Sequence, residues 1–177
     1  RWVVEALLEN MNIAHEQGDV NTSDQDPPDV VALGAKFEIK EILNPGRRRH
    51  EEYKQELERA REAKTAEDLL TRFTPVDSSI TEIFDLCCTE IKALEEKYPP
   101  SVRASLDLLF YVNLQHVMKV NENPFPDCSL MNSAGWRSVS FVKGQIASCF
   151  YAAPKAPSWL QDMVGHVSHK RFEEIST

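Results

Sequence analysis

The amino-acid sequence predicts an α/β protein in which helices cover both faces of a mixed β-sheet, giving three layers. Three observations predict it: an amphipathic segment opens the chain, two β-rich runs follow as a hairpin, and a long amphipathic segment precedes an apolar run of β-forming residues. A helix between two strands allows them to lie parallel in one sheet through a crossover. A sheet with two buried faces needs helices on each side, so a three-layer arrangement follows.

Length and composition fit one domain, residues 1–177, with a core to about residue 115 and a C-terminal extension over about 116–177. Apolar residues make up 42% and charged residues 27%, as in soluble globular proteins. No apolar run approaches the ~20 residues that a membrane span needs. The four cysteines show no CxxC spacing, which predicts reduced thiols and a cytoplasmic location. The net charge of −8 argues against bulk attraction to nucleic acid but is compatible with a nuclease that has local basic patches.

The chain is expected to open with a helix, a short extended piece and a polar loop. Apolar residues recur over residues 2–11 at the three- and four-residue spacing of a core-facing helix. An extended piece is expected over residues 12–15. Turn-forming residues and two prolines then indicate a loop over residues 18–28.

Two β-rich runs, residues 29–33 and 36–43, are separated by a turn near Gly34 and predict a β-hairpin. Residues 44–46, Asn-Pro-Gly, end the second strand because they favour a turn.

The second half of the chain alternates helices and strands. Charged and polar helix formers dominate residues 47–64, which is typical of a solvated helix. Residues 80–97 carry one apolar stripe and follow good N-cap residues, so they predict a second core-facing helix. The apolar run over residues 106–114 predicts a buried central strand. The C-terminal extension is expected to contain strands at 137–142 and 145–152, a helix at 158–164 and a basic tail.

A charged pair on the second strand of the hairpin is the first functional signal. Glu38 and Lys40 are two residues apart, so they face the same side of the strand, while Phe37 and Ile39 face the other. This pattern alone also fits the exposed face of an amphipathic strand.

Asp29, at the start of the hairpin, strengthens the functional interpretation. A two-residue turn at Leu33-Gly34 places Asp29 opposite Glu38, and a turn at Gly34-Ala35 places it opposite Lys40. A three-residue turn would separate the three side chains. Two carboxylates that close together need a cation between them, and a site with one or two carboxylates suits Mg²⁺.

The series Pro28-Asp29, eight residues, Glu38-Ile39-Lys40 resembles the PD…EXK signature of the PD-(D/E)XK, or restriction endonuclease-like, nuclease superfamily. The order of the expected elements is similar to the αβββαβ core of that superfamily, with the C-terminal hairpin and helix as an extension. Longer segments, among them RWVVEALLENMNI and YAAPKAPSWL, resemble a family of small bacterial proteins of unknown function that are catalogued as endonucleases.

The resemblance implies a metal-dependent endonuclease that acts on DNA, with RNA left open as a substrate. Asp29 and Glu38 would bind Mg²⁺, or Mn²⁺ in its place, together with the carbonyl oxygen of Ile39. Lys40 would position or help to deprotonate the attacking water, whose pKa the metal lowers. A homodimer would suit double-strand cleavage.

The superfamily often adds an acidic residue on the first helix as a further ligand. Glu5 is the first candidate and Glu9, one turn on, is the next. The position could also fall at or before Arg1.

A basic cluster follows the second strand of the hairpin. Arg47, Arg48 and Arg49 are expected to open the next helix and to bind DNA phosphates, and Lys54 extends the same face. The alternative is a solvated helix in which these arginines pair with neighbouring glutamates.

The alternative function is a catalytically inactive nuclease-fold module that binds another protein or a nucleic acid. The acidic net charge, the undecided acid on the first helix and the small basic surface favour this alternative.

Overall fold

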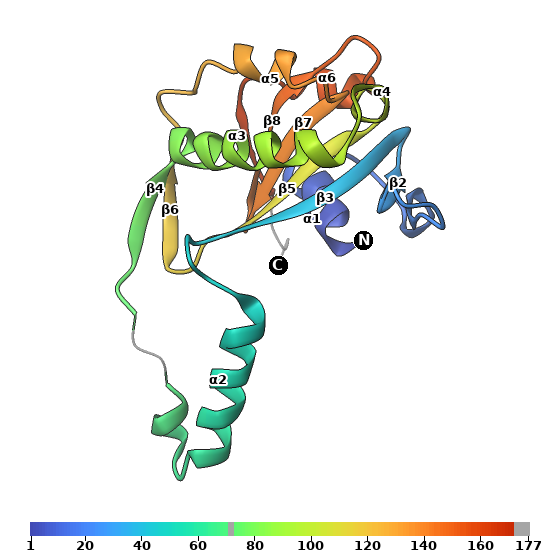
Figure 1. The fold of residues 1–177 in the computed structure, drawn as a ribbon. Helices are drawn as coiled ribbons and strands as arrows, with labels where there is room; N and C mark the ends of the chain where they lie inside the picture. Colours follow the sequence, from blue (N-terminus) through green and yellow to red (C-terminus); the bar gives the residue numbers. More distant parts are fainter. Residues whose placement is uncertain (71–72, 172–177) are drawn as a thin grey trace, which may run out of the picture.

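The computed structural model describes residues 1–70 and 73–171, and its central feature is a seven-stranded mixed sheet (Figure 1). The strands lie in the order β1-β2-β3-β5-β7-β8-β9. Their bounds are β1 Val20–Thr22, β2 Val30–Ala32, β3 Ala35–Leu43, β5 Asp107–Asn113, β7 Ser138–Lys143, β8 Ile146–Ala152 and β9 Val167–His169. Strands β4 (Val76–Ser79) and β6 (Val117–Asn121) pair in a separate, parallel two-stranded sheet.

Helices cover both faces of the large sheet, as the sequence predicts. Helix α1 (Trp2–Asn10) packs on the face that carries Phe37 and Leu109, whereas α3 (Ile80–Lys97) packs on the face that carries Leu108 and Phe110. Helix α3 begins where a capping box satisfies its first N–H groups: the Ser79 hydroxyl accepts from the Glu82 N–H at 3.1 Å. The remaining α-helices near the sheet are α4 Pro100–Arg103, α5 Ser129–Ser133 and α6 Ser158–Gln161.

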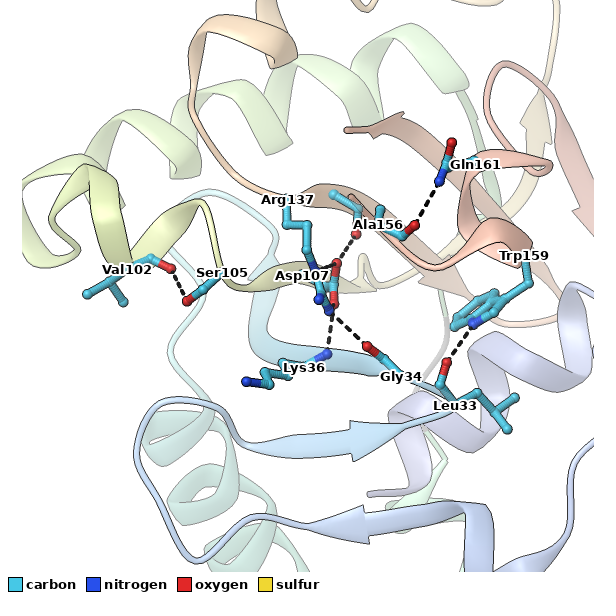
Figure 2. Close-up of polar contacts among 11 residues, drawn as sticks. Leu33, Gly34, Lys36, Val102, Ser105, Asp107, Arg137, Ala156, Trp159 and Gln161 are labelled. Carbon is cyan, nitrogen blue, oxygen red and sulfur yellow. Dashed lines mark hydrogen bonds and ion pairs between the residues drawn. The ribbon is translucent and has the colours of Figure 1, made fainter. Parts of the chain in front are cut away.

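The β2–β3 hairpin has the first of the two registers expected from the sequence. Ala32 pairs with Ala35 and Val30 with Phe37, so the turn is Leu33-Gly34. Both turn residues have positive φ, 47° for Leu33 and 80° for Gly34, which is the backbone that a tight two-residue turn between twisted strands requires. The indole N–H of Trp159 on α6 donates to the Leu33 carbonyl at 3.1 Å and holds the turn in place (Figure 2).

The crossover through α3 is confirmed, because β3 and β5 are parallel neighbours. Their register runs from Phe37 opposite Asp107 to Leu43 opposite Asn113. Strand β7 then lies parallel to β5, and β8 returns antiparallel after a turn at Gly144. Strands β7, β8 and β9 therefore continue the same sheet as the predicted core, although the sequence suggested an extension there.

Several local expectations were wrong. Residues 12–15 form no strand, and β1 instead lies within the segment expected to be a polar loop. A strand of three residues is too short to show an alternating pattern. The last helix ends at Gln161, and part of the basic tail forms the edge strand β9.

Helix α2 (Arg49–Glu62) and the short 3-10 helix η2 (Ala66–Leu69) extend away from the sheet as an arm (Figure 1). No residue of either helix is buried, in agreement with the solvated helix that the composition predicts. The arm is inserted between β3 and the crossover helix, so it leaves the pairing of β3 with β5 intact.

A buried carboxylate joins three strands at one end of the sheet. Asp107, at the start of β5, is completely buried and accepts hydrogen bonds through both oxygens (Figure 2). Its Oδ1 accepts from Arg137 Nε at 3.0 Å and from the Ser138 hydroxyl at 2.8 Å, and its Oδ2 accepts from the Lys36 backbone N–H at 2.7 Å and from Arg137 Nη2. The same guanidinium donates to the Gly34 carbonyl at 3.2 Å. Asp107 thus ties the β2–β3 hairpin, β5 and β7 together.

We expect Asp107→Ala to lower the free energy of unfolding by about 3–5 kcal/mol, because it leaves the largely buried Arg137 charge without its partner. Urea unfolding followed by circular dichroism measures the loss. Glu51→Ala is the matched control: it breaks the exposed Arg48–Glu51 ion pair at 3.2 Å and should change the free energy by about 0–1 kcal/mol. Equal losses in the two variants would contradict the role assigned to Asp107.

Candidate active site around Glu38

Glu38 lies on β3, between β2 and β5 in the sheet, and points toward α3. Its neighbours Phe37 and Ile39 pack with α1 on the opposite face, while Ile42, further along β3, packs with α3. Alternation along the strand therefore directs Glu38 and Lys40 to the α3 face. Only 2% of Glu38 is exposed to solvent, which is uncommon for a carboxylate.

The two oxygens of Glu38 differ in their surroundings. Oε1 accepts a hydrogen bond from the Tyr98 hydroxyl at 2.5 Å and pairs with the Lys40 ammonium. Oε2 is buried as well and has no hydrogen-bond partner within the described residues. A buried polar atom without a protein partner is costly unless it binds an ordered water or a ligand.

The charges of this cluster support one another. Burial lowers the pKa of Lys40, but the hydrogen bond and the negative charge of Glu38 outweigh burial and raise that pKa above its usual value. Burial, followed by the hydrogen bond to Glu38, raises the pKa of Tyr98 to about 12. At neutral pH the cluster therefore holds a protonated phenol and a charged ammonium against one carboxylate.

Tyr98 is the functional candidate that the sequence did not reveal. It follows the last residue of α3, where Pro99 and Pro100 indicate only the end of the helix. Its ring packs edge-on against Trp136, with ring centroids 5.5 Å apart, and the Lys97 ammonium lies 4.9 Å from the ring centroid. No local pattern in the sequence indicates that a residue 60 positions after Glu38 will reach it.

Asp29 reaches the peptide that joins Glu38 and Ile39. Its Oδ2 accepts a hydrogen bond from the Ile39 N–H at 2.7 Å, and its own N–H donates to the Phe37 carbonyl at 2.9 Å. The Asp29 side chain thus occupies the place of a backbone acceptor beside β3. Unlike Glu38, Asp29 is exposed.

The structure does not bring an acid of the first helix together with Glu38. Glu5 pairs with Arg1 at 2.8 Å, and Glu9 pairs with Lys170 at 2.6 Å. Helix α1 covers the Phe37 face of the sheet, so both acids belong to the face opposite Glu38.

The arginine cluster differs from the expected phosphate-binding group. Helix α2 begins at Arg49 rather than Arg47, and each of the three guanidinium groups pairs with a carboxylate. Lys54 lies further along the helix and is exposed. The ion pairs are Arg47–Glu52, Arg48–Glu51 and Arg49–Glu41. The pairs with Glu51 and Glu52 are those of the alternative that the sequence left open, whereas Arg49 pairs with Glu41 on β3.

Within the part of the chain that the structure describes, no group of three or more His, Cys, Asp or Glu side chains could hold a metal ion. A cation at Glu38 would therefore need oxygens from Asp29, the backbone, water or a substrate in addition. All four cysteines are free thiols, as predicted. No helix within the described residues is long and apolar enough to cross a membrane.

Comparison with protein families matches residues 1–174 to a family described as "Putative endonuclease, protein of unknown function (DUF1780)". The chain belongs to the DUF1780 family. No curated protein matches the sequence of this DUF1780 member. A solved structure from Pseudomonas aeruginosa strain PAO1, described as a protein of unknown function of the monooxygenase superfamily, is similar with a TM-score of 0.71. It is 24% identical, and the match covers 98% of this chain and 82% of that chain, which shows a shared fold.

The raised pKa of Tyr98 predicts a loss of stability at alkaline pH. Between about pH 10 and pH 12 the unfolded tyrosine is ionised while the folded one keeps its proton, so the free energy of unfolding falls as the pH rises through this window. Tyr98→Phe has no phenol at this position, so its free energy of unfolding should fall less steeply over the same range. Urea midpoints of both proteins at stepped pH values measure the difference. Parallel slopes for the wild type and Tyr98→Phe would contradict the burial of the Tyr98 phenol.

Proposed function

We propose that this DUF1780 protein is a metal-dependent endonuclease that hydrolyses phosphodiester bonds in DNA, with its site at Asp29, Glu38 and Lys40. One observation carries the proposal: one oxygen of the buried Glu38 carboxylate has no partner among residues 1–70 and 73–171, and it lies beside Lys40 and next to the peptide that Asp29 contacts. The description of the family as an endonuclease supports the same reaction class.

The carboxylate oxygens of Glu38 and Asp29 are of the kind that binds a magnesium ion. Mg²⁺ keeps several of its waters and binds through one or two carboxylates plus substrate phosphate oxygens, so it does not need a cage of protein ligands. Glu38 Oε2 offers one such oxygen. Asp29 offers its Oδ1, which accepts no hydrogen bond from the described residues. Mn²⁺ has the same preference for oxygen ligands and would substitute.

Each side chain has a distinct task in this proposal. A bound divalent metal would polarise the phosphodiester and lower the pKa of the attacking water. Glu38 and Asp29 would bind that metal, with the Ile39 carbonyl as a further oxygen. Lys40, already charged and close to Glu38, would position the water and offset phosphate charge.

The order of the elements supports a restriction endonuclease-like core. Helix α1, strands β1, β2 and β3, helix α3 and strand β5 follow one another as α, β, β, β, α, β, with the arm inserted before α3. The parallel pairing of β3 with β5 completes the arrangement that the resemblance implies. The free thiols suit a cytoplasmic enzyme, and a homodimer would cut both strands of a duplex. RNA shares the phosphodiester chemistry and is the second substrate to test.

A binding module is the second candidate, favoured by the burial of Glu38 and by the ion pairs of the arginines. If Glu38 serves only to pair with Lys40 and Tyr98, the cluster is part of the core and needs no metal. Arginines that are already paired with glutamates attract DNA phosphates less than free ones.

Plasmid nicking in Mg²⁺, Mn²⁺ or EDTA tests the nuclease proposal. The full chain should nick DNA with either metal and not in EDTA. Lys40→Ala should lower the rate by about 10²–10⁴-fold, the usual contribution of a positioned proton-transfer group. Glu38→Ala should lower the rate as well, because it removes a proposed metal ligand. Rates are compared at equal protein concentration on supercoiled DNA, single-stranded DNA and RNA.

Lys36→Ala is the matched control for Lys40→Ala. Lys36 lies on the same strand and faces the same side, but its side chain is exposed and only its backbone N–H contacts Asp107. It should nick at the wild-type rate. Nicking that survives Glu38→Ala and Lys40→Ala would come from another site or another protein, and absence of nicking on all three substrates would favour the binding module.

A further inference from the structure

The Tyr98 hydroxyl is the nearest group to Glu38 that the proposed mechanism does not use. It comes from the end of α3, is buried, and donates a 2.5 Å hydrogen bond to Glu38 Oε1. Lys40, the second donor to the same oxygen, lies on the same strand as Glu38. Tyr98 is therefore the contact that ties the carboxylate to a different element of the fold.

Two donors on one oxygen make the two oxygens of Glu38 different. The terminal torsion of a glutamate side chain is broad and roughly two-fold, so a carboxylate without such contacts exchanges its oxygens freely. With the phenol and the ammonium on Oε1, the other oxygen, Oε2, is left to accept a further partner. This asymmetry suits a ligand that must present one oxygen in a fixed direction.

Tyr98 is itself held in place by several contacts. Its backbone N–H donates to the Leu94 carbonyl at 3.0 Å, and two prolines follow it directly in the chain. Its ring packs edge-on against the buried Trp136 at 5.5 Å and lies under the Lys97 ammonium. Because the Tyr98 side chain is already ordered, little of its conformational entropy would be lost when Glu38 binds a ligand.

A tyrosine is suited to this place because its hydroxyl donates to Glu38 Oε1 while its ring packs against Trp136. A phenylalanine of the same shape would keep the packing against Trp136 and lose only the hydrogen bond.

We propose that Tyr98 is a positioning residue, which orients Glu38 through Oε1 so that Oε2 is the oxygen available to a divalent cation. The inference rests on the proposed function, since it assigns Tyr98 a role in the same metal site. It concerns the direction of a ligand oxygen and involves no contact of Tyr98 with the metal or the substrate.

Binding of Mn²⁺ to the full chain, measured by calorimetry and by the paramagnetic resonance signal of free Mn²⁺, tests this role. Tyr98→Phe should bind Mn²⁺ about 10–100-fold more weakly, the usual effect of removing a group that orients a metal ligand. Glu38→Gln should abolish binding at the site. Tyr151→Phe is the matched control, because it removes the same atom on β8, beyond β5 and β7 in the sheet, and should bind Mn²⁺ like the wild type.

The outcomes separate the inference from the proposed function. Wild-type affinity or tighter binding in a folded Tyr98→Phe would overturn the positioning role and leave the metal site standing. Absence of Mn²⁺ binding in the wild type would overturn both. A purely structural role would lower the unfolding midpoint of Tyr98→Phe without a change in its affinity for Mn²⁺.

A measurement on the wild-type protein decides the matter even if Tyr98→Phe does not fold. A hydroxyl proton in a short hydrogen bond to a carboxylate resonates far downfield, and the Tyr98 signal is identified by its loss in Glu38→Gln. The signal should persist when Mg²⁺ saturates the site, because the cation takes Oε2 and leaves Oε1 with the phenol. Its loss on addition of Mg²⁺ would mean that the metal displaces Tyr98, and the positioning role would be wrong.

Discussion

The hydrogen-bonded carboxylate of Asp107 is the interaction on which the arrangement of the sheet depends. It lies where β3, β5 and β7 start side by side. Arg137, which donates to Asp107, also donates to the Gly34 carbonyl in the β2–β3 turn. The backbone N–H of Lys36 donates to it, and this hydrogen bond fixes the start of β3 relative to β5. A hairpin whose register slipped by one residue would move every side chain of β3 to the other face.

With the register fixed, β3 serves two cores at once. Its odd-numbered positions Phe37 and Ile39 pack under α1, and its even-numbered positions point to α3. Glu38 is therefore placed beneath the end of α3 by the same alternation that buries Phe37. The crossover brings Tyr98 over this strand, so the candidate site lies where the end of α3 contacts Glu38 on β3.

The sequence predicts the parts of the fold that local patterns govern. The stripe over residues 80–97 gives α3 with its observed bounds, and the turn at Leu33-Gly34 is one of two registers that the hairpin allowed. The contacts of the site depend on tertiary structure instead. Tyr98 meets Glu38 across 60 residues, and Arg49 finds its partner Glu41 on the strand before its helix. Periodicity describes which face of an element is buried, but it says nothing about which residue of another element lies there.

Two buried carboxylates on neighbouring strands, Asp107 and Glu38, differ in the hydrogen bonds that their oxygens accept. Among the described residues, Asp107 and Glu38 are the acids with less than a tenth of their surface exposed to solvent. Asp107 has donors on both oxygens, as a carboxylate that only holds strands together should. Glu38 has both of its donors on Oε1, and no described residue donates to Oε2, which costs about 1–3 kcal/mol of desolvation. An apolar residue would avoid that cost. The contrast between Glu38 and Asp107 therefore supports the proposal that Oε2 binds a ligand.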